Sequence, residues 1–302
     1  MRDVSIQAEL SSVRAESCRT STDGRSAIRP LWLLPNLLSL DAPVIAVVWQ
    51  ALFAEAAGVR LALSASMALA LAVWSVYLAD RMLDAGRAEQ DGDAARHRFC
   101  REHRNTYLYL LILVLITGSG AAAFVRPSLL VEGISFGGAV MVYFAVVHRP
   151  ELQRTPSIPK EFLVSLLFAA GTILAPWMRT GEHRLLAAGA AGFFLACLVN
   201  TSVIEDFEWK RLRREIGPGP HRLTRMVSGH CKILSLSAAV VCAGVGVISS
   251  DGLRTLMMAA AASHLALFAV CSSKRHLTPE AFRVLADVAL LSPAALLLWR
   301  WF

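Results

Sequence analysis

Two short acidic segments contain the residues best suited to do chemistry. Asp80 and Asp84 end one apolar stretch, and Glu205, Asp206 and Glu208 end another about 120 residues later. Residues four apart lie on one face of a helix, so the carboxylates of Asp80 and Asp84 can approach the same ion. Mg²⁺ takes oxygen ligands and is commonly held by one or two carboxylates together with substrate phosphates. The pattern predicts a site for divalent cations and a diphosphate, although a pair of capping or ion-paired aspartates would give the same spacing.

The second acidic segment has its own geometry. On a helix Glu205 and Glu208 lie about 60° apart, whereas Asp206 points about 100° away from Glu205. Asn200 precedes them and could add a neutral oxygen ligand or a hydrogen bond to the site. The alternative for Asn200 is a polar contact between packed membrane helices.

Basic residues accompany both acidic segments and could neutralise a diphosphate and the charge that builds on it as it leaves. The other interpretation is surface charge that orients the chain in the membrane and contacts anionic lipid. His97 and His103 lie in one of these basic runs without ligand spacing, which predicts surface positions. The candidate phosphate-binding residues are Arg96, Arg98, Arg101, Arg104, Lys160, Lys210 and Arg211.

The elements that must position these residues are membrane spans. The chain has 302 residues, of which 55% are hydrophobic and 18% charged, and this predicts an all-α polytopic membrane protein. Apolar runs of about 17–25 residues predict nine spans, over 36–57, 61–80, 106–125, 129–147, 161–178, 185–205, 231–249, 253–271 and 282–301.

The charge distribution predicts the orientation of these spans. The leader and the loops after even-numbered spans hold 24 of the 30 Lys and Arg residues, a positive-inside bias. We therefore expect an inner-membrane protein with residues 1–30 as a disordered cytoplasmic leader, both acidic segments facing the cytoplasm, and the carboxyl terminus on the opposite side. The net charge of +7 lies in the loops and has this topological explanation, so no nucleic-acid partner is expected.

The chain has nine predicted spans, with one acidic motif at the end of the second, another at the end of the sixth, and a basic loop after each. In this pattern it resembles the UbiA superfamily of intramembrane prenyltransferases. The resemblance covers about residues 31–302, the predicted transmembrane domain. In that family an NxxxDxxxD motif ends the second helix and an Asp-rich motif ends the sixth, and both bind Mg²⁺ and an isoprenyl diphosphate. The resemblance places Asp80 and Asp84 in the first motif, and Asn200, Glu205 and Glu208 in the second.

This chain departs from the family pattern at two points. Val76 stands where the first motif has asparagine, and the second motif uses glutamate where aspartate is usual. The resemblance implies transfer of an isoprenyl group from an allylic diphosphate to a lipophilic or aromatic acceptor in the membrane. Its metal ligands would be Asp80, Asp84, Glu205 and Glu208. Two alternatives stay open: a membrane terpene cyclase on the same scaffold, and a non-catalytic membrane protein with a degenerate metal site.

Overall fold

The structure is a computed structural model that describes residues 31–86, 95–147, 159–213 and 219–299, and within these ranges every regular element is a helix. The all-α prediction is therefore confirmed for the described residues. The chain divides into two units, residues 1–34 and 35–302, and the second is described below. The predicted leader over 1–30 lies outside the described residues.

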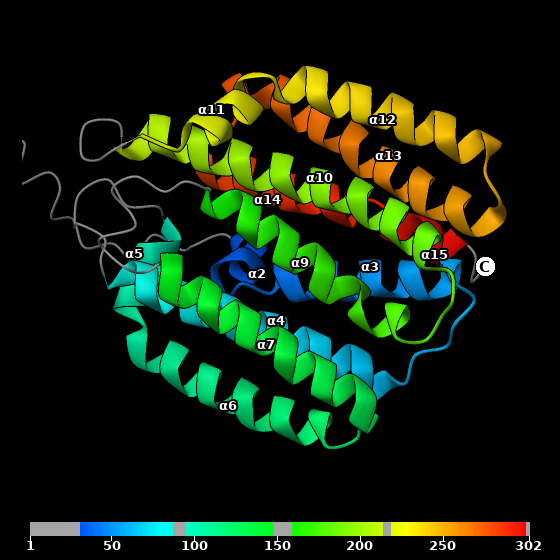
Figure 1. The fold of residues 1–302 in the computed structure, drawn as a ribbon. Helices are drawn as coiled ribbons and strands as arrows, with labels where there is room; N and C mark the ends of the chain where they lie inside the picture. Colours follow the sequence, from blue (N-terminus) through cyan, green and yellow to red (C-terminus); the bar gives the residue numbers. More distant parts are fainter. Residues whose placement is uncertain (1–30, 87–94, 148–158, 214–218, 300–302) are drawn as a thin grey trace, which may run out of the picture. The chain divides into compact units, whose positions relative to one another are not determined.

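Among the described residues seven helices are long and apolar enough to cross a membrane, which indicates a membrane protein. An eighth span is present if the broken helix pair Leu31–Leu37 and Asp41–Ala56 (α3) counts as one. Figure 1 shows the long helices running back and forth between two ends of the bundle. The seven are α4 (Leu63–Ala85), α6 (Arg104–Ala122), α7 (Pro127–Val147), α9 (Lys160–Trp177), α10 (His183–Glu208), α12 (Cys231–Ile248) and α13 (Asp251–Ser273).

The ninth predicted span, over 282–301, is divided. It corresponds to α14 (Pro279–Leu291) and α15 (Ala294–Trp299), which are separated by Ser292 and Pro293. Proline has no backbone N–H and clashes with the preceding turn, so it interrupts a helix. Neither piece is long enough to count as a span, and the number nine is not confirmed.

Helix α10 lies at the centre of the unit and packs against α9, α11 (Arg222–Gly229), α12, α13 and α14. The apolar core around it is anchored by Trp49 of α3, whose ring stacks on Phe193 of α10 with centroids 4.2 Å apart. The indole Nε1 of Trp49 also donates to the carbonyl of Leu290 over 2.9 Å. One aromatic side chain therefore joins α3, α10 and α14.

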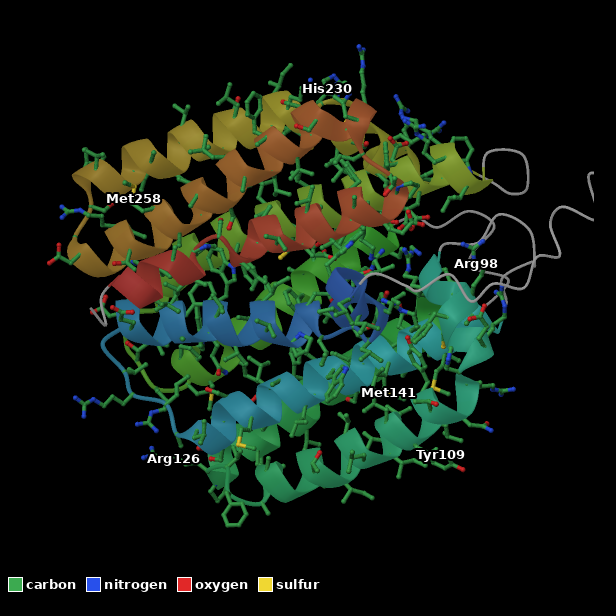
Figure 2. All side chains as sticks on the ribbon, turned by 180° about the vertical axis from the view of Figure 1, so that it is seen from behind. Arg98, Tyr109, Arg126, Met141, His230 and Met258 are labelled. Atoms are coloured by element: carbon green, nitrogen blue, oxygen red, sulfur yellow. The ribbon has the colours of Figure 1, made fainter. Side chains whose placement is uncertain are left out.

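The outer helices show mostly apolar side chains to their surroundings. Tyr109, Met141 and Met258 are exposed on these helices (Figure 2), and α7 has no buried residue. Arg98 and Arg126 lie at opposite ends of the bundle (Figure 2). Apolar flanks between charged ends are what lipid contact requires.

The ends of α4 and α10 and the start of α9 lie at the same end of the bundle (Figure 1). Short helices gather there. Thr278 caps the start of α14 by accepting a hydrogen bond from the Ala281 N–H at 3.2 Å. Pro279 lies in the first turn of α14, where its missing N–H breaks no helical hydrogen bond. Further short elements at this end include α5 (Ala95–Glu102), the π-helix η3 (Trp209–Arg213) and the 3₁₀-helix η4 (Lys274–His276).

Candidate functional site

A cavity of about 730 Å³ opens at this end of the bundle and collects residues from both acidic segments. Asp80 and Asp84 of α4 line it together with Glu205 of α10. Asp80 and Asp84 are four residues apart near the end of α4, so the helix directs both carboxylates to the same side. Three of the four predicted metal ligands therefore share one cavity.

Cations and an amide from the predicted set line the same cavity. Lys160 begins α9 directly after Pro159, and its Nζ lies 3.8 Å from Oε2 of Glu205. Arg96 of α5 and Asn200 of α10 also line it. The cavity therefore brings opposite charges from four helices to one place.

Part of the remaining wall is apolar and aromatic, and the rest is formed by further polar and charged side chains. Tyr77 of α4 and Phe168 of α9 meet edge to face, with ring centroids 6.3 Å apart. Tyr143 of α7, Ile45 of α3 and Leu290 of α14 line further parts of it. A cavity with a charged portion and an apolar portion suits a ligand with an anionic head and a hydrocarbon chain.

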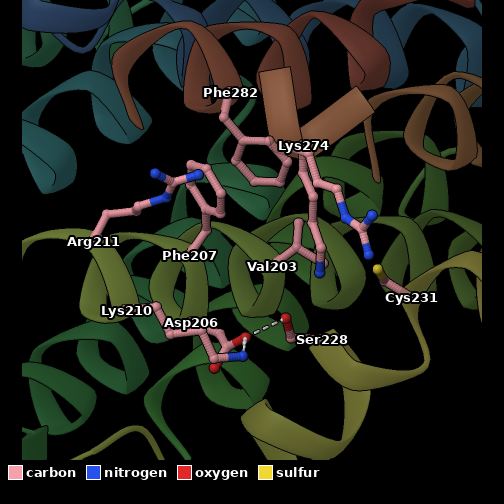
Figure 3. Close-up of a pocket in the computed structure, with 10 residues that line it drawn as sticks. Val203, Asp206, Phe207, Lys210, Arg211, Ser228, Cys231, Lys274 and Phe282 are labelled. Atoms are coloured by element: carbon pink, nitrogen blue, oxygen red, sulfur yellow. Dashed lines mark hydrogen bonds and ion pairs between the residues drawn. The ribbon is translucent and has the colours of Figure 1, made fainter. Parts of the chain in front are cut away.

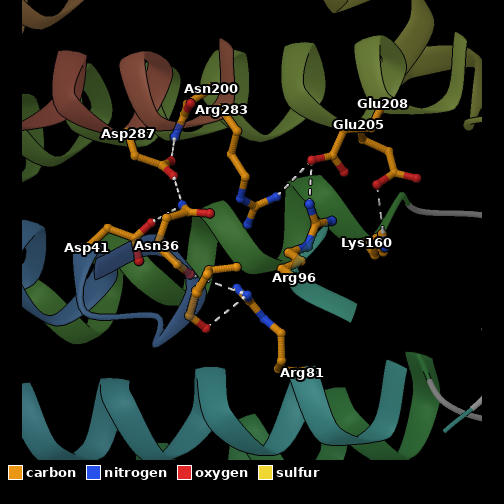
Figure 4. A network of polar contacts seen from close by, with 11 residues as sticks. Asn36, Asp41, Arg81, Arg96, Lys160, Asn200, Glu205, Glu208, Arg283 and Asp287 are labelled. Carbon is orange, nitrogen blue, oxygen red and sulfur yellow. Dashed lines mark hydrogen bonds and ion pairs between the residues drawn. The ribbon is translucent and has the colours of Figure 1, made fainter. Parts of the chain in front are cut away.

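Glu208 occupies a different place from the one the resemblance implies. It is 4% exposed and does not line the cavity. Its Oε1 pairs with the guanidinium of Arg96 and lies 3.5 Å from Nη1 of Arg283 on α14 (Figure 4). Two arginines hold this carboxylate, so its observed contacts are those of a buried ion-pair group that fixes α5 and α14 to α10.

The other predicted basic residues lie outside the cavity. Arg98 and Arg104 are exposed and Arg101 is half-buried. Lys210 pairs with Asp206 at 2.7 Å, and Arg211 lies over the Phe207 ring, 5.4 Å from its centroid. Of the seven predicted phosphate-binding cations, those that line the cavity are Arg96 and Lys160.

A buried polar network lies along the same cavity and was not predicted as a unit. Nδ2 of Asn36 donates to Asp41 over 2.7 Å and to Asp287 over 3.0 Å. Nδ2 of Asn200 donates to the second oxygen of Asp287 over 3.0 Å (Figure 4). Asp41, Asn200 and Asp287 line the cavity. The sequence signal was the presence of acids at membrane depth, but no spacing links residue 36 to residue 287.

The turn between α2 (Leu34–Leu37) and α3 is held by side chains from α4 and α6. A helix end leaves carbonyls without partners. Arg81 donates to the carbonyls of Asn36 and Leu37 over 3.3 and 3.4 Å. Trp74 donates to that of Leu38 over 2.9 Å, and Tyr107 also donates to Leu37. These bonds fix the backbone from which Asn36 reaches the network.

Helix α5 contributes a buried face to the site. His97 was predicted at the surface, but it is 2% exposed and lines the cavity. The prediction was wrong because the basic run folds into a helix whose one face is covered by α4. Cys100 lies one turn later, and burial raises the pKa of its thiol.

The donor set fits Mg²⁺ in part. Asp80, Asp84 and Glu205 offer carboxylate oxygens to the cavity, whereas Glu208 is held by its two arginines. Among the described residues no group of three or more His, Cys, Asp or Glu side chains is arranged to hold a metal ion by itself. Mg²⁺ would therefore need phosphate oxygens of a substrate to complete its coordination, as is common for this ion.

Searches of protein-family models, curated proteins and solved structures found no significant match to this chain. The resemblance to the UbiA superfamily therefore rests on the pattern of predicted spans, acidic motifs and basic loops, and it stays a prediction.

Proposed function

We propose that the protein is a Mg²⁺-dependent membrane prenyltransferase that takes an allylic isoprenyl diphosphate as donor and a lipophilic or aromatic molecule as acceptor. The observation that carries the proposal is the cavity that joins Asp80, Asp84 and Glu205 to an apolar aromatic wall. The proposal includes a UbiA-like arrangement of nine spans, with α14 and α15 together forming the last one.

The charged side chains of the cavity would bind the head of the donor. When bound, Mg²⁺ supplies positive charge that stabilises the diphosphate as a leaving group. Asp80 and Asp84 would hold the ion from α4, and Glu205 would hold it from α10. Lys160 and Arg96 would contact the diphosphate oxygens directly, where charge-assisted hydrogen bonds are strongest.

The apolar wall would bind the chain of the donor. The bond between the allylic carbon and the diphosphate oxygen breaks, and its electron pair leaves with the diphosphate. Tyr77, Tyr143 and Phe168 line the cavity, and the face of an aromatic ring stabilises a neighbouring cation. The acceptor then attacks the allylic carbon and loses a proton. The apolar side chains around the donor chain would exclude water and so protect the cation from hydrolysis.

The test is diphosphate release from purified full-length protein supplied with geranyl, farnesyl or geranylgeranyl diphosphate and Mg²⁺. Asp80→Asn and Asp84→Asn should each lower the rate by about 100-fold or more, the usual effect of losing one electrostatic contact to the transition state. The control is Asp251→Asn at the other end of the bundle, where the side chain is 92% exposed. Equal rates in all four proteins would refute the proposal.

One observation favours a second candidate, a membrane protein that binds such a ligand without turning it over. Glu208, which the resemblance assigns to the metal, is held by Arg96 and Arg283. An unreactive farnesyl thiodiphosphate distinguishes the two candidates. A binding protein would be stabilised against heat by this analogue and would release no diphosphate from farnesyl diphosphate.

A further inference from the structure

A second, smaller cavity of about 250 Å³ lies on the other side of α10 from the cavity described above. It is lined by residues of α10, η3, α11, α12, η4 and α14 (Figure 3). Its lining residues are Val203, Asp206, Phe207, Lys210, Arg211, Ser228, Cys231, Lys274, Arg275 and Phe282.

Helical periodicity separates the two cavities. On α10, Thr201 and Glu205 face the larger cavity, whereas Val203 and Phe207 face the smaller one. Residues two apart on a helix point about 160° away from each other, because each residue turns the helix by about 100°. The smaller cavity is therefore a separate site rather than an extension of the first.

The smaller cavity is strongly basic. Four of its lining side chains are cations and one is a carboxylate. Asp206, 2% exposed, accepts hydrogen bonds of 2.7 Å from both Ser228 and Lys210, so it neutralises Lys210 (Figure 3). Within the described parts of the chain, no carboxylate pairs with the other three cations. They are Arg211, Lys274 and Arg275.

The floor of the cavity is apolar. Phe207 and Phe282 place their rings 4.4 Å apart, and Val203 lies beside them. Arg211 is oriented by the Phe207 ring, and it belongs to the π-helix η3, a wider turn that is often found at functional sites. Cations above an apolar floor suit a ligand that carries an anionic group on a hydrocarbon body.

The position of the smaller cavity at this end of the bundle also restricts the chemical class of its ligand. Positive charge in the sequence predicts that this end faces the cytoplasm, where the membrane surface carries anionic phospholipids. Arginine matches phosphate oxygens with a fork of N–H donors, and lysine adds a point charge. We propose that this pocket binds a phosphate group at the membrane surface, as presented by the headgroup of an anionic phospholipid.

The experiment uses purified full-length protein in an uncharged detergent. Three probes are titrated separately: dioctanoyl phosphatidylglycerol, dioctanoyl phosphatidylcholine and inorganic phosphate. Affinity is measured by calorimetry, and bound lipid is counted by native mass spectrometry. Tighter binding of phosphatidylglycerol than of inorganic phosphate assigns the site to a lipid headgroup. Tighter binding of inorganic phosphate assigns it to a soluble anion. Either result supports a phosphate site.

The decisive variant is Lys274→Ala/Arg275→Ala, which should weaken binding of the preferred anion by about tenfold or more. Its matched control is Arg222→Ala/Arg225→Ala, which removes the same charge from exposed positions on α11 that do not line the pocket. The control should change affinity by less than about twofold. Arg211→Gln gives an independent variant if the first one fails to fold.

Two results would overturn the proposal. One is equal weakening by the two double variants, because binding would then follow net charge rather than the pocket. The other is binding of phosphatidylcholine as tightly as both anions. Diphosphate release enters neither measurement, so failure here leaves the proposed catalytic function untouched.

Discussion

Asn200 donates a hydrogen bond from its Nδ2 to Oδ1 of Asp287 over 3.0 Å, although 87 positions separate them in the sequence. This bond connects α10 to α14. Asp287 accepts a second bond from Asn36, so both of its oxygens are occupied by amide donors. A buried carboxylate is tolerated when donors satisfy it, and here the donors come from distant parts of the chain.

This pair makes a prediction about stability. Asn200→Asp would place two carboxylates against each other and should destabilise the protein by about 1–3 kcal/mol, the usual cost of an unsatisfied buried polar group. Asn200→Asp/Asp287→Asn would restore one donor and one acceptor at this contact, while the amide oxygen introduced at position 287 could still accept from Asn36. The thermal midpoint of the double variant should therefore exceed that of the single variant. A double variant no more stable than Asn200→Asp would contradict the assigned bond.

Substitutions of Glu205 and Glu208 should have different effects on activity and stability. Glu205 lines the large cavity, whereas Glu208 is buried in an ion pair. Glu208→Gln should lower the thermal midpoint because Arg96 and Arg283 would both lose the buried carboxylate that they share. Glu205→Gln should lower diphosphate release and leave the midpoint nearly unchanged. The reverse pattern would assign the metal site to Glu208, as the family resemblance implies.

Two glycines provide a matched test of helix packing. A methyl group on Gly252 of α13 would lie 2.3 Å from the carbonyl oxygen of Ala56, whereas one on Gly244 of α12 would meet nothing within 4 Å. Gly252→Ala should therefore destabilise the protein by about 1–3 kcal/mol through overpacking. Gly244→Ala should stabilise it by about 0.5–1 kcal/mol through helix propensity. Thermal unfolding of both variants in one detergent compares them directly.

Chemical labelling tests the predicted orientation. The described cysteines are buried, and burial keeps Cys100 protonated by raising its pKa, so their background labelling should be low. In a protein with Cys18 changed to serine, new cysteines at the exposed positions Gly181 and Arg222 should differ in their labelling. A membrane-impermeant maleimide added to intact cells should label Gly181→Cys and spare Arg222→Cys. If only Arg222→Cys were labelled, the protein would have the opposite orientation in the membrane.

Local patterns in the sequence predicted the parts of the site that depend on one helix. Apolar length predicted the long helices. The spacing of Asp80 and Asp84 predicted their common direction, and both line the large cavity as expected. Asp206 was predicted to turn away from Glu205, and it lines the second cavity.

Contacts between distant segments could not be predicted from such local patterns. The pairing of Glu208 with Arg96 and Arg283 depends on how α5 and α14 dock on α10, which no periodicity encodes. His97 was misplaced for the same reason, because its burial is decided by a neighbouring helix. Asn36 and Asp287 are 251 positions apart in the sequence, so no local pattern could predict their hydrogen bond.

Helix α7 has no buried residue, and its aromatic Phe136 would be only 3.0 Å from a methyl group added at Gly171 of α9. At most positions of this helix, selection should therefore act on the hydrophobicity of the side chain rather than on its shape. Among orthologues we expect the residues of α7 that do not line the large cavity to interchange freely within the aliphatic set, whereas Tyr143 should be retained. Phe136 and Gly171 should change together.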